Sequence, residues 1–144
     1  MERPKVMVAL RDVESVEALA QLGAHLANGI KASLLLVHVV QVPPALPLDA
    51  DAEALDKPGK QVLSAARQAA STWGTAAIET RLVRAREAGP ALIDEAQSSG
   101  ANLLVMGYHG AHGLSEVILG STVQFVARHA PCRVIVQIQP VHHA

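Results

Sequence analysis

The amino-acid sequence predicts an α/β fold: an open, Rossmann-like parallel sheet with helices on both of its faces. Short apolar runs alternate with segments whose apolar residues recur at helical spacing, and this alternation is typical of parallel strands joined by right-handed crossovers. Several runs are almost continuously apolar, as strands buried on both faces are. A glycine-rich stretch follows the fourth run at residues 106–122. Because such sheets bind ligands beyond the carboxyl ends of their strands, this stretch marks the expected site.

The first three elements follow from the spacing of apolar residues. Residues 5–10, KVMVAL, form a short apolar run and are expected to be a strand. Within residues 15–30 the apolar positions fall at three- and four-residue steps, which predicts an amphipathic helix. Residues 33–40, SLLLVHVV, are apolar throughout most of their length, which favours a strand covered on both faces.

A long loop is expected next, over residues 41–56. The stretch from Gln41 to Gly59 contains four prolines and several acids, so we expect no regular element in it and predict a mobile loop that is unusually long for a compact domain. A second helix is expected over residues 60–73, with its apolar side chains inward.

The second half of the chain continues the alternation. Residues 77–85 alternate like a half-buried strand with charged residues outward, which favours the edge of the sheet. A helix over 89–99 has a proline in its first turn and a glycine just after its end. We then expect a strand at 102–107, a helix over 115–129 that restarts near its middle glycine, and a fifth strand at 132–138.

Composition bounds the possible functions. The 144 residues suit one domain, 1–144, with an ordinary core. The net charge is −1 and aromatic residues make up 2% of the chain, whereas nucleic-acid-binding proteins carry basic surfaces and stacking rings. No apolar run approaches the roughly 20 residues of a membrane helix, and the N-terminus lacks the layout of a signal peptide. The lone cysteine, Cys132, fits a reducing compartment. We therefore expect a cytoplasmic protein without nucleic-acid binding or membrane insertion.

The glycine-rich stretch suggests a cradle for phosphate. Gly107 and Gly110 follow the fourth strand, and Gly120 precedes Ser121 and Thr122 at the start of a helical segment. Glycines let backbone amides approach a ligand, and a helix N-terminus with free amides attracts anions. The stretch matches neither the P-loop pattern nor GxGxxG. A glycine-rich turn followed by a capped helix is the alternative explanation.

Other reactive side chains are assigned ordinary roles. His109 and His112 lie in the loop without the further ligands that a metal site needs. His38 is expected to be a satisfied strand histidine, Cys132 a small buried residue and Trp73 a packing residue. The sequence shows no set of nucleophile, base and orienting group, so no catalytic residue is assigned.

The C-terminal third resembles a known family. The string GYHGAHGLSEVILGSTVQFVARHAPCRVIV is similar to the C-terminal signature of the universal stress protein family, and its glycines and Ser121 match that family's pattern G-x2-G-x9-G-[S/T]. The strings GANLLVMG and LLLVHVV also resemble strands of the family. The resemblance implies strand order 3-2-1-4-5, a homodimer that pairs through the strand at 132–138, and ATP or another adenine nucleotide in the cleft.

The same resemblance implies a set of site residues. Main-chain and hydroxyl groups of the glycine-rich stretch would hold the phosphates and ribose, apolar residues would flank the adenosine, and the end of the first strand would complete the cleft. The implied nucleotide-binding residues are Ala9, Arg11, Val39, Met106, Gly107, Gly110, Gly120, Ser121 and Thr122. No metal is expected beyond the Mg that accompanies a nucleotide.

Arg11 departs from the family's pattern. Nucleotide-binding members have an aspartate at this position, and here Asp12 lies one residue later, where it is expected to cap the following helix. Arg11 is then either a solvated surface charge or a guanidinium that faces the cleft and pairs with phosphate.

Three functions remain open from the sequence. The first is a regulatory protein that binds an adenine nucleotide (ATP, ADP or AMP) and is not an enzyme. The second is a dimeric interaction domain of the same fold with weak or no nucleotide binding, because LRDVESVEAL also resembles stress-protein-like domains attached to membrane transporters. The third is an ATP hydrolase or phosphotransferase, which the absence of a carboxylate at the end of the first strand disfavours.

Overall fold

Five parallel strands form one sheet in the order β3-β2-β1-β4-β5 in the computed structural model, which describes residues 3–74, 77–109 and 120–139. The predicted fold class, the implied strand order and the edge position of β3 are confirmed. The elements in chain order are β1 (Lys5–Ala9), α1 (Val16–Ile30), β2 (Ser33–Gln41), α2 (Glu53–Thr72), β3 (Ile78–Ala85), α3 (Ala88–Ser99), β4 (Leu103–His109), α4 (Ser121–His129) and β5 (Arg133–Gln139).

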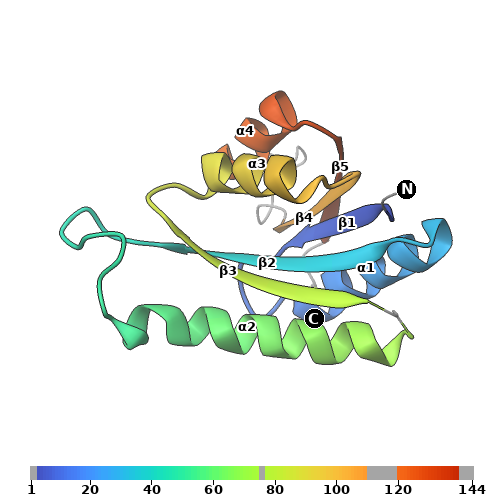
Figure 1. Ribbon diagram of the computed structural model, residues 1–144, viewed down its shortest axis with the longest axis horizontal. Coiled ribbons are helices and arrows are strands. Elements are labelled where there is room, and N and C mark those ends of the chain that lie inside the picture. Colours follow the sequence, from blue (N-terminus) through green and yellow to red (C-terminus); the bar gives the residue numbers. More distant parts are fainter. Residues whose placement is uncertain (1–2, 75–76, 110–119, 140–144) are drawn as a thin grey trace.

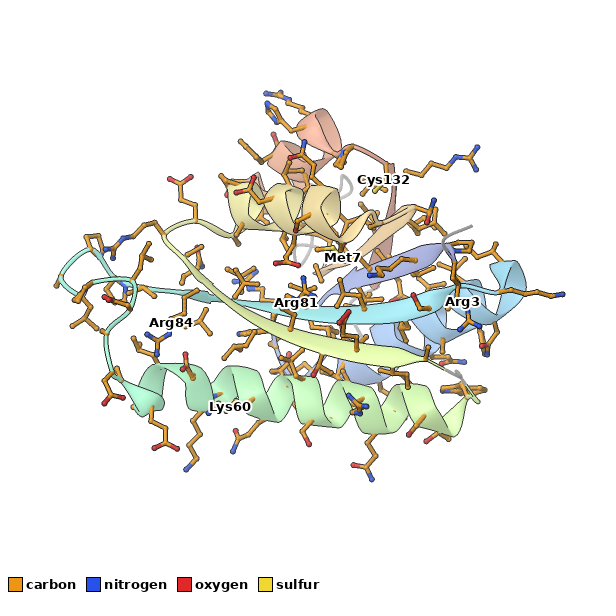
Figure 2. The ribbon with its side chains drawn as sticks, viewed as in Figure 1. Arg3, Met7, Lys60, Arg81, Arg84 and Cys132 are labelled. Atoms are coloured by element: carbon orange, nitrogen blue, oxygen red, sulfur yellow. The ribbon has the colours of Figure 1, made fainter. Side chains whose placement is uncertain are left out.

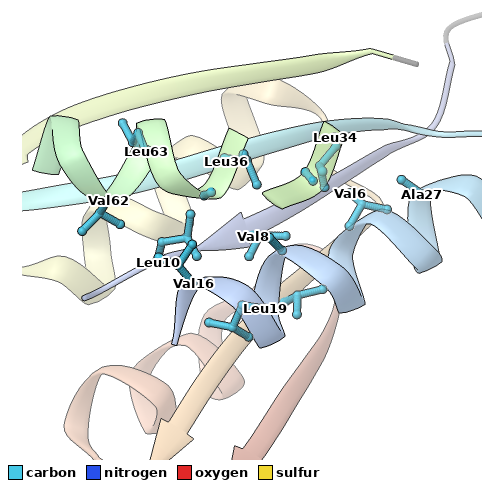
Figure 3. Close-up of a cluster of buried hydrophobic side chains, with 14 of the residues drawn as sticks. Val6, Val8, Leu10, Val16, Leu19, Ala27, Leu34, Leu36, Val62 and Leu63 are labelled. Atoms are coloured by element: carbon cyan, nitrogen blue, oxygen red, sulfur yellow. The ribbon is translucent and has the colours of Figure 1, made fainter. Parts of the chain in front are cut away.

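Helices cover both faces of the sheet. Helices α1 and α2 pack on one face, here called the α1/α2 face, and α3 and α4 pack on the other, the α3/α4 face (Figure 1). Side chains alternate along a strand, so β1 contributes Val6 and Val8 to the core beneath α1 and α2 (Figure 3), and Met7 to the core beneath α3 and α4. All three are fully buried. This burial on both faces explains why the strand sequences are almost continuously apolar.

The predicted loop over 41–56 is wrong at both of its boundaries. Strand β2 extends to Gln41, and α2 begins at Glu53 with Pro58 inside it, so the connecting segment is residues 42–52. The four prolines and the acids of residues 41–59 predict no regular element, but Gly59 lets α2 pack closely on the sheet: a Cβ built there would lie 2.6 Å from Cδ2 of His38 and 2.7 Å from Cδ1 of Leu82. This packing outweighs the single helical hydrogen bond that the proline removes.

Two arginines at the end of β3 hold the 42–52 segment. Arg84 donates to the carbonyls of Leu48 and Ala50, and Arg86 donates to the carbonyls of Val42, Pro43 and Leu46. Arg84 also makes a bidentate ion pair with Asp56 in the first turns of α2, with bonds of 3.0 and 2.9 Å; its side chain points toward that end of the helix (Figure 2). The segment is thereby tied to the sheet edge and to α2.

The helices that the structure describes are not of the membrane-spanning kind. None of them is both long enough and apolar enough to cross a bilayer.

Candidate functional site

The sheet has a topological switch point between β1 and β4. Strands β2 and β3 lie on one side of β1, and the chain then crosses from edge strand β3 to β4 on its other side. Connections that leave β1 and β4 at their carboxyl ends therefore run to opposite faces of the sheet, and ligands bind at such a point in this class of fold. Most of the predicted site residues lie on elements that end or begin at this edge.

Apolar residues form one wall of the predicted site. Ala9 on β1, Val39 on β2 and Met106 on β4 all belong to the core on the α3/α4 face. Met106 is buried, with 5% of its surface exposed, whereas Ala9 and Val39 are half-buried. The structure thus brings these three predicted residues to one face of three neighbouring strands.

The N-terminus of α4 supplies hydrogen-bond donors. Gly120 is its N-cap and provides no side-chain cap, and the first helical bond runs from the N–H of Gln124 to the carbonyl of Gly120 at 3.0 Å. The amides of Ser121, Thr122 and Val123 therefore have no partner within the helix. The side chain of Ser121 is exposed and that of Thr122 is half-buried. Together with the positive end of the helix dipole, these groups favour an anion.

Gly120 leaves space at this helix end. A Cβ built on it would have Cε1 of Tyr108, 4.0 Å away, as its nearest described neighbour. Its backbone, with φ −66° and ψ 164°, is one that any residue adopts. The glycine is therefore not required by the local conformation, and no described side chain packs closely against it.

Gly107 has a packing role that the sequence did not predict. Its missing side chain faces α1: a Cβ there would lie 3.0 Å from Cδ1 of Leu19, a residue that is 2% exposed. Close packing of α1 on β4 accounts for this glycine. Sequence reasoning missed the contact, because no local pattern links position 107 to position 19.

Gly110, the remaining predicted glycine, lies outside the described residues, as do His112 and the rest of residues 110–119. The same holds for the side chain of His109.

The exit of β1 is held by specific hydrogen bonds. The N–H of Leu10 donates to the carbonyl of Val37 at 2.8 Å, and Nδ1 of His38 lies 2.8 Å from the carbonyl of Leu10. His38 is thus a satisfied strand histidine, as expected. Arg11 follows with an exposed side chain.

Asp12 serves the start of α1. Its Oδ1 accepts hydrogen bonds from the N–H and the hydroxyl of Ser15, both at 3.1 Å. Ser15 itself is the N-cap residue, so Asp12 stabilises the turn that leads into the helix. The expectation that Asp12 itself caps the helix is wrong: the N-cap is Ser15, and Asp12 accepts hydrogen bonds in the turn before it.

Other reactive groups in the described part of the chain are not arranged for chemistry. These residues contain no group of three or more His, Cys, Asp or Glu side chains that could hold a metal ion. Burial raises the pKa of the Cys132 thiol, which keeps it protonated and a poor nucleophile at neutral pH. Trp73 packs edge-on against His25, with ring centroids 4.8 Å apart, consistent with a packing role.

A separate cavity of about 400 Å³ lies between the end of β3 and the first turns of α3. None of the predicted site residues lines it. Three of its charged groups have partners within the protein, since Arg84 and Arg86 hold the 42–52 segment and Glu95 pairs with Arg81 at 2.6 Å, whereas Glu87 and Asp94 are exposed. The cavity therefore adds no group to the site at β1 and β4.

Comparisons with known proteins find the same family that the sequence resembles. The family model described as the universal stress protein family matches residues 2–137. Universal stress protein MJ0531 of Methanocaldococcus jannaschii is 30% identical over 132 residues, which cover 88% of this chain and 76% of that protein.

Solved structures show the same fold. A universal stress protein from Archaeoglobus fulgidus in complex with dAMP superposes with a TM-score of 0.72 at 20% identity, covering 94% of this chain and 97% of the other. A family member from Arabidopsis thaliana with AMP bound superposes with a TM-score of 0.65 at 19% identity, covering 94% and 92%.

Proposed function

Because this chain belongs to the universal stress protein family, we propose that it is a regulatory protein that binds an adenine nucleotide at the carboxyl ends of β1 and β4. The observation that carries the proposal is the N-terminus of α4, where three backbone amides lack helical partners and a Cβ built on Gly120 would meet no described atom closer than 4.0 Å. The dAMP and AMP complexes of proteins with this fold support an adenine nucleotide as the ligand. ATP, ADP and AMP are the candidates.

Different site residues would bind different parts of the nucleotide. The amides at the start of α4 and the hydroxyls of Ser121 and Thr122 would bind phosphate, which suits their character as donors. The apolar side chains of Ala9, Val39 and Met106 would flank the adenosine. Gly107 and Gly110 would contribute main-chain groups, and a triphosphate would bring its own Mg.

We propose binding without turnover as the function. In the part of the site that the structure describes, the groups are donors and apolar side chains, and the hydroxyl of Ser15, which bonds to the carboxylate of Asp12, is buried at the start of α1. Occupancy of the cleft would then be the signal. Phosphate release from ATP by the purified protein tests this point: sustained release with a measurable turnover number would show an enzyme instead.

A second candidate function is a dimeric interaction domain, with weak or no nucleotide binding and a transporter among its partners. The observation that favours it is Arg11, which places an exposed cation at the exit of β1. In both candidates the protein would form a homodimer through the edge of β5.

Mass spectrometry separates the two candidates. The protein is purified under native conditions without added nucleotide, and its ligand is extracted and identified. We expect an adenine nucleotide at a substantial fraction of one per chain. An empty protein that also gains no thermal stability from ATP, ADP or AMP would support the interaction domain.

A further inference from the structure

We propose that the protein docks on an anionic phospholipid surface through the edge of the sheet at which the strands begin. This edge lies opposite the proposed nucleotide site, so the inference stands independently of nucleotide binding. We call the docking surface the amino-edge patch. It consists of four basic residues and two exposed apolar ones: Arg3, Lys5, Lys31, Arg133, Ile30 and Trp73.

The ends of α1 and α2 form the apolar part of the patch. Both helices end on the same side of the molecule, where the N-terminus also lies (Figure 1). The side-chain amide of Asn28 in α1 donates to the carbonyl of Trp73 at 3.0 Å and joins the two helix ends. Ile30 and Trp73 are 44% and 41% exposed, although the ring of Trp73 packs edge-on against His25. Part of the indole ring is therefore open to a partner.

Backbone hydrogen bonds place the cations next to these helix ends. Lys31 directly follows α1 and has an exposed side chain. The N–H of Ser33, at the start of β2, donates to the carbonyl of Pro4 at 2.9 Å. Because Pro4 stands between Arg3 and Lys5, both of these residues lie beside the start of β2. The side chain of Lys5 is half-buried and that of Arg3 is exposed (Figure 2).

The row of cations continues across the sheet to β5. The N–H of Lys5 donates to Oδ1 of Asn102, directly before β4, at 2.8 Å. Leu103, the first residue of β4, is paired in register with Arg133, the first residue of β5. The side chain of Arg133 is exposed. The patch therefore extends over the starts of β2, β1, β4 and β5.

The four cations are not neutralised within the described residues. None of them forms an ion pair there. Glu79 on β3 is the acid in the described stretches that begin or end at this edge, and it pairs with Arg81 at 3.5 Å; Glu2 lies outside the described residues. The helix dipole of α1 accounts for Lys31. The other three cations precede or begin strands, and the dipole of a sheet is too small to stabilise them.

A lipid surface fits this combination of side chains better than a peptide or a nucleic acid. Basic residues attract anionic headgroups, and a tryptophan ring is stable at headgroup level, where it meets both apolar chains and water. The cavity between β3 and α3 lies at the opposite edge of the sheet and offers a peptide no pocket here. Surfaces that bind nucleic acid single strands carry several stacking rings, whereas the patch carries the one ring of Trp73.

Trp73 supplies the signal for the test, because it is the only tryptophan of the chain. The protein is mixed with vesicles of phosphatidylcholine alone and with vesicles that also contain phosphatidylserine. We expect cosedimentation with the anionic vesicles only, weakened by salt. On binding, the emission of Trp73 should shift to shorter wavelength, and lipids brominated on their acyl chains should quench it.

Two double variants with the same change in charge locate the contact. Arg3→Gln with Lys31→Gln should lower the apparent affinity for the anionic vesicles at least about tenfold. The control is Lys57→Gln with Lys60→Gln, which changes two exposed lysines near the start of α2, at the other end of that helix. It should bind as the wild type does.

Three results would overturn the inference: no binding to the anionic vesicles, equal losses in both double variants, or binding without a change in the emission of Trp73. Poly-glutamate and a DNA duplex are tested beside the vesicles. If either binds while the vesicles do not, the inference is also wrong, and the patch serves an acidic protein or a nucleic acid instead.

Discussion

Gly107 and Gly120 belong to one glycine-rich stretch, but the surroundings of their Cβ positions differ. The position of a Cβ on Gly107 is filled by Leu19 of α1, whereas a Cβ on Gly120 would meet no described atom closer than 4.0 Å. The first glycine serves packing inside the protein. The second lies at the start of α4, where we propose that the ligand binds, and no described side chain packs closely against it. Valine at the two positions should therefore have opposite effects.

Gly120→Val should abolish nucleotide binding and leave the protein folded. The valine adopts the local backbone without strain, but its methyl groups cover the approach to the amides of α4. Nucleotide at 100 times its dissociation constant stabilises a native protein by about 2.7 kcal/mol, which raises the melting temperature by about 5–10 °C at this size. The wild type should show this shift and the variant should not.

Gly29→Val is the matched control, since a Cβ at Gly29 in α1 also meets open space. It should keep the full shift. Equal shifts in wild type and Gly120→Val would remove α4 from the site.

Gly107→Val should destabilise the protein directly. The added methyl groups press on Leu19, which is buried and has no room to move away. Overpacking of this kind costs about 1–3 kcal/mol. Denaturant unfolding without ligand measures the loss; a variant as stable as the wild type would mean that α1 shifts freely on the sheet.

At the scale of elements, two arginines at the end of β3, Arg84 and Arg86, bind the 42–52 segment. Arg84 and Arg86 together bind five carbonyl oxygens of the 42–52 segment, and Arg84 also pairs with Asp56 of α2. The segment leads directly from β2, the strand that carries Val39, into α2. These contacts therefore connect a sheet edge, a proline-rich segment and the start of a helix.

Arg84→Ala should loosen both the 42–52 segment and the first turns of α2. The variant loses the bidentate pair with Asp56 and the two carbonyl contacts at once. Hydrogen exchange should become faster at the amides of Leu46 and Ala50, which close turns within the segment, and at the start of α2. Arg67→Ala, an exposed arginine further along α2, is the control and should leave exchange unchanged there.

The pH dependence of this difference has a defined sign. The hydrogen bond from Arg84 lowers the pKa of Asp56, although burial opposes the shift. A carboxyl group whose pKa is lowered on folding stabilises the protein above its unfolded pKa, and that contribution is lost as the pH falls through the folded value. The exchange difference between wild type and Arg84→Ala should be full at neutral pH and shrink below about pH 4. A difference that grows in acid would contradict this.

At the scale of the whole molecule, β5 forms one edge of the sheet and carries apolar side chains along it. Val134 and Val136 are half-buried, and Ile138 is 47% exposed. An edge strand of this composition is a ready template for pairing with a second chain. A symmetric dimer would cover it, since a two-fold axis brings the same strand of both chains together.

Ile138→Lys should convert the proposed dimer into monomers. The lysine places a charge on each copy where two apolar edges would meet, while its exposed position spares the core. Ile30→Lys is the control, because Ile30 in α1 is similarly exposed, at 44%, away from this edge. Light scattering measures the mass of both; a dimer that survives Ile138→Lys would place the interface elsewhere. Ile135→Pro is a less specific test of the interface, since Ile135 packs against the core and its replacement would also affect folding.

Much of the fold follows from the sequence alone. The alternation of apolar runs and helical periodicity predicts the strands and most of the helices, because burial on one or two faces acts residue by residue and leaves a local pattern. Gly100 marks the end of α3 because its left-handed backbone, with φ 69°, is a local requirement. Asp12 is expected from the sequence to cap α1 itself, but its partner Ser15, three residues on, is the N-cap instead. The donors of α4 could also be predicted, since Gly120 and the residues after it are contiguous.

Only the tertiary structure decided the features that depend on distant partners. The start of α2 depends on Gly59 packing against His38 and Leu82, and on Asp56 meeting Arg84. Gly107 is explained by Leu19, which is 88 positions away in the chain (107 − 19). That Asp12 is engaged by Ser15, and that Arg11 pairs with no described residue, is apparent only in the structure. The spacing of residues along the chain reflects which face of its own helix or strand a residue lies on. Contacts between different elements produce no periodic pattern in the sequence. Such contacts explain why Gly107 is needed for packing, and the sequence alone could not separate its role from that of Gly120.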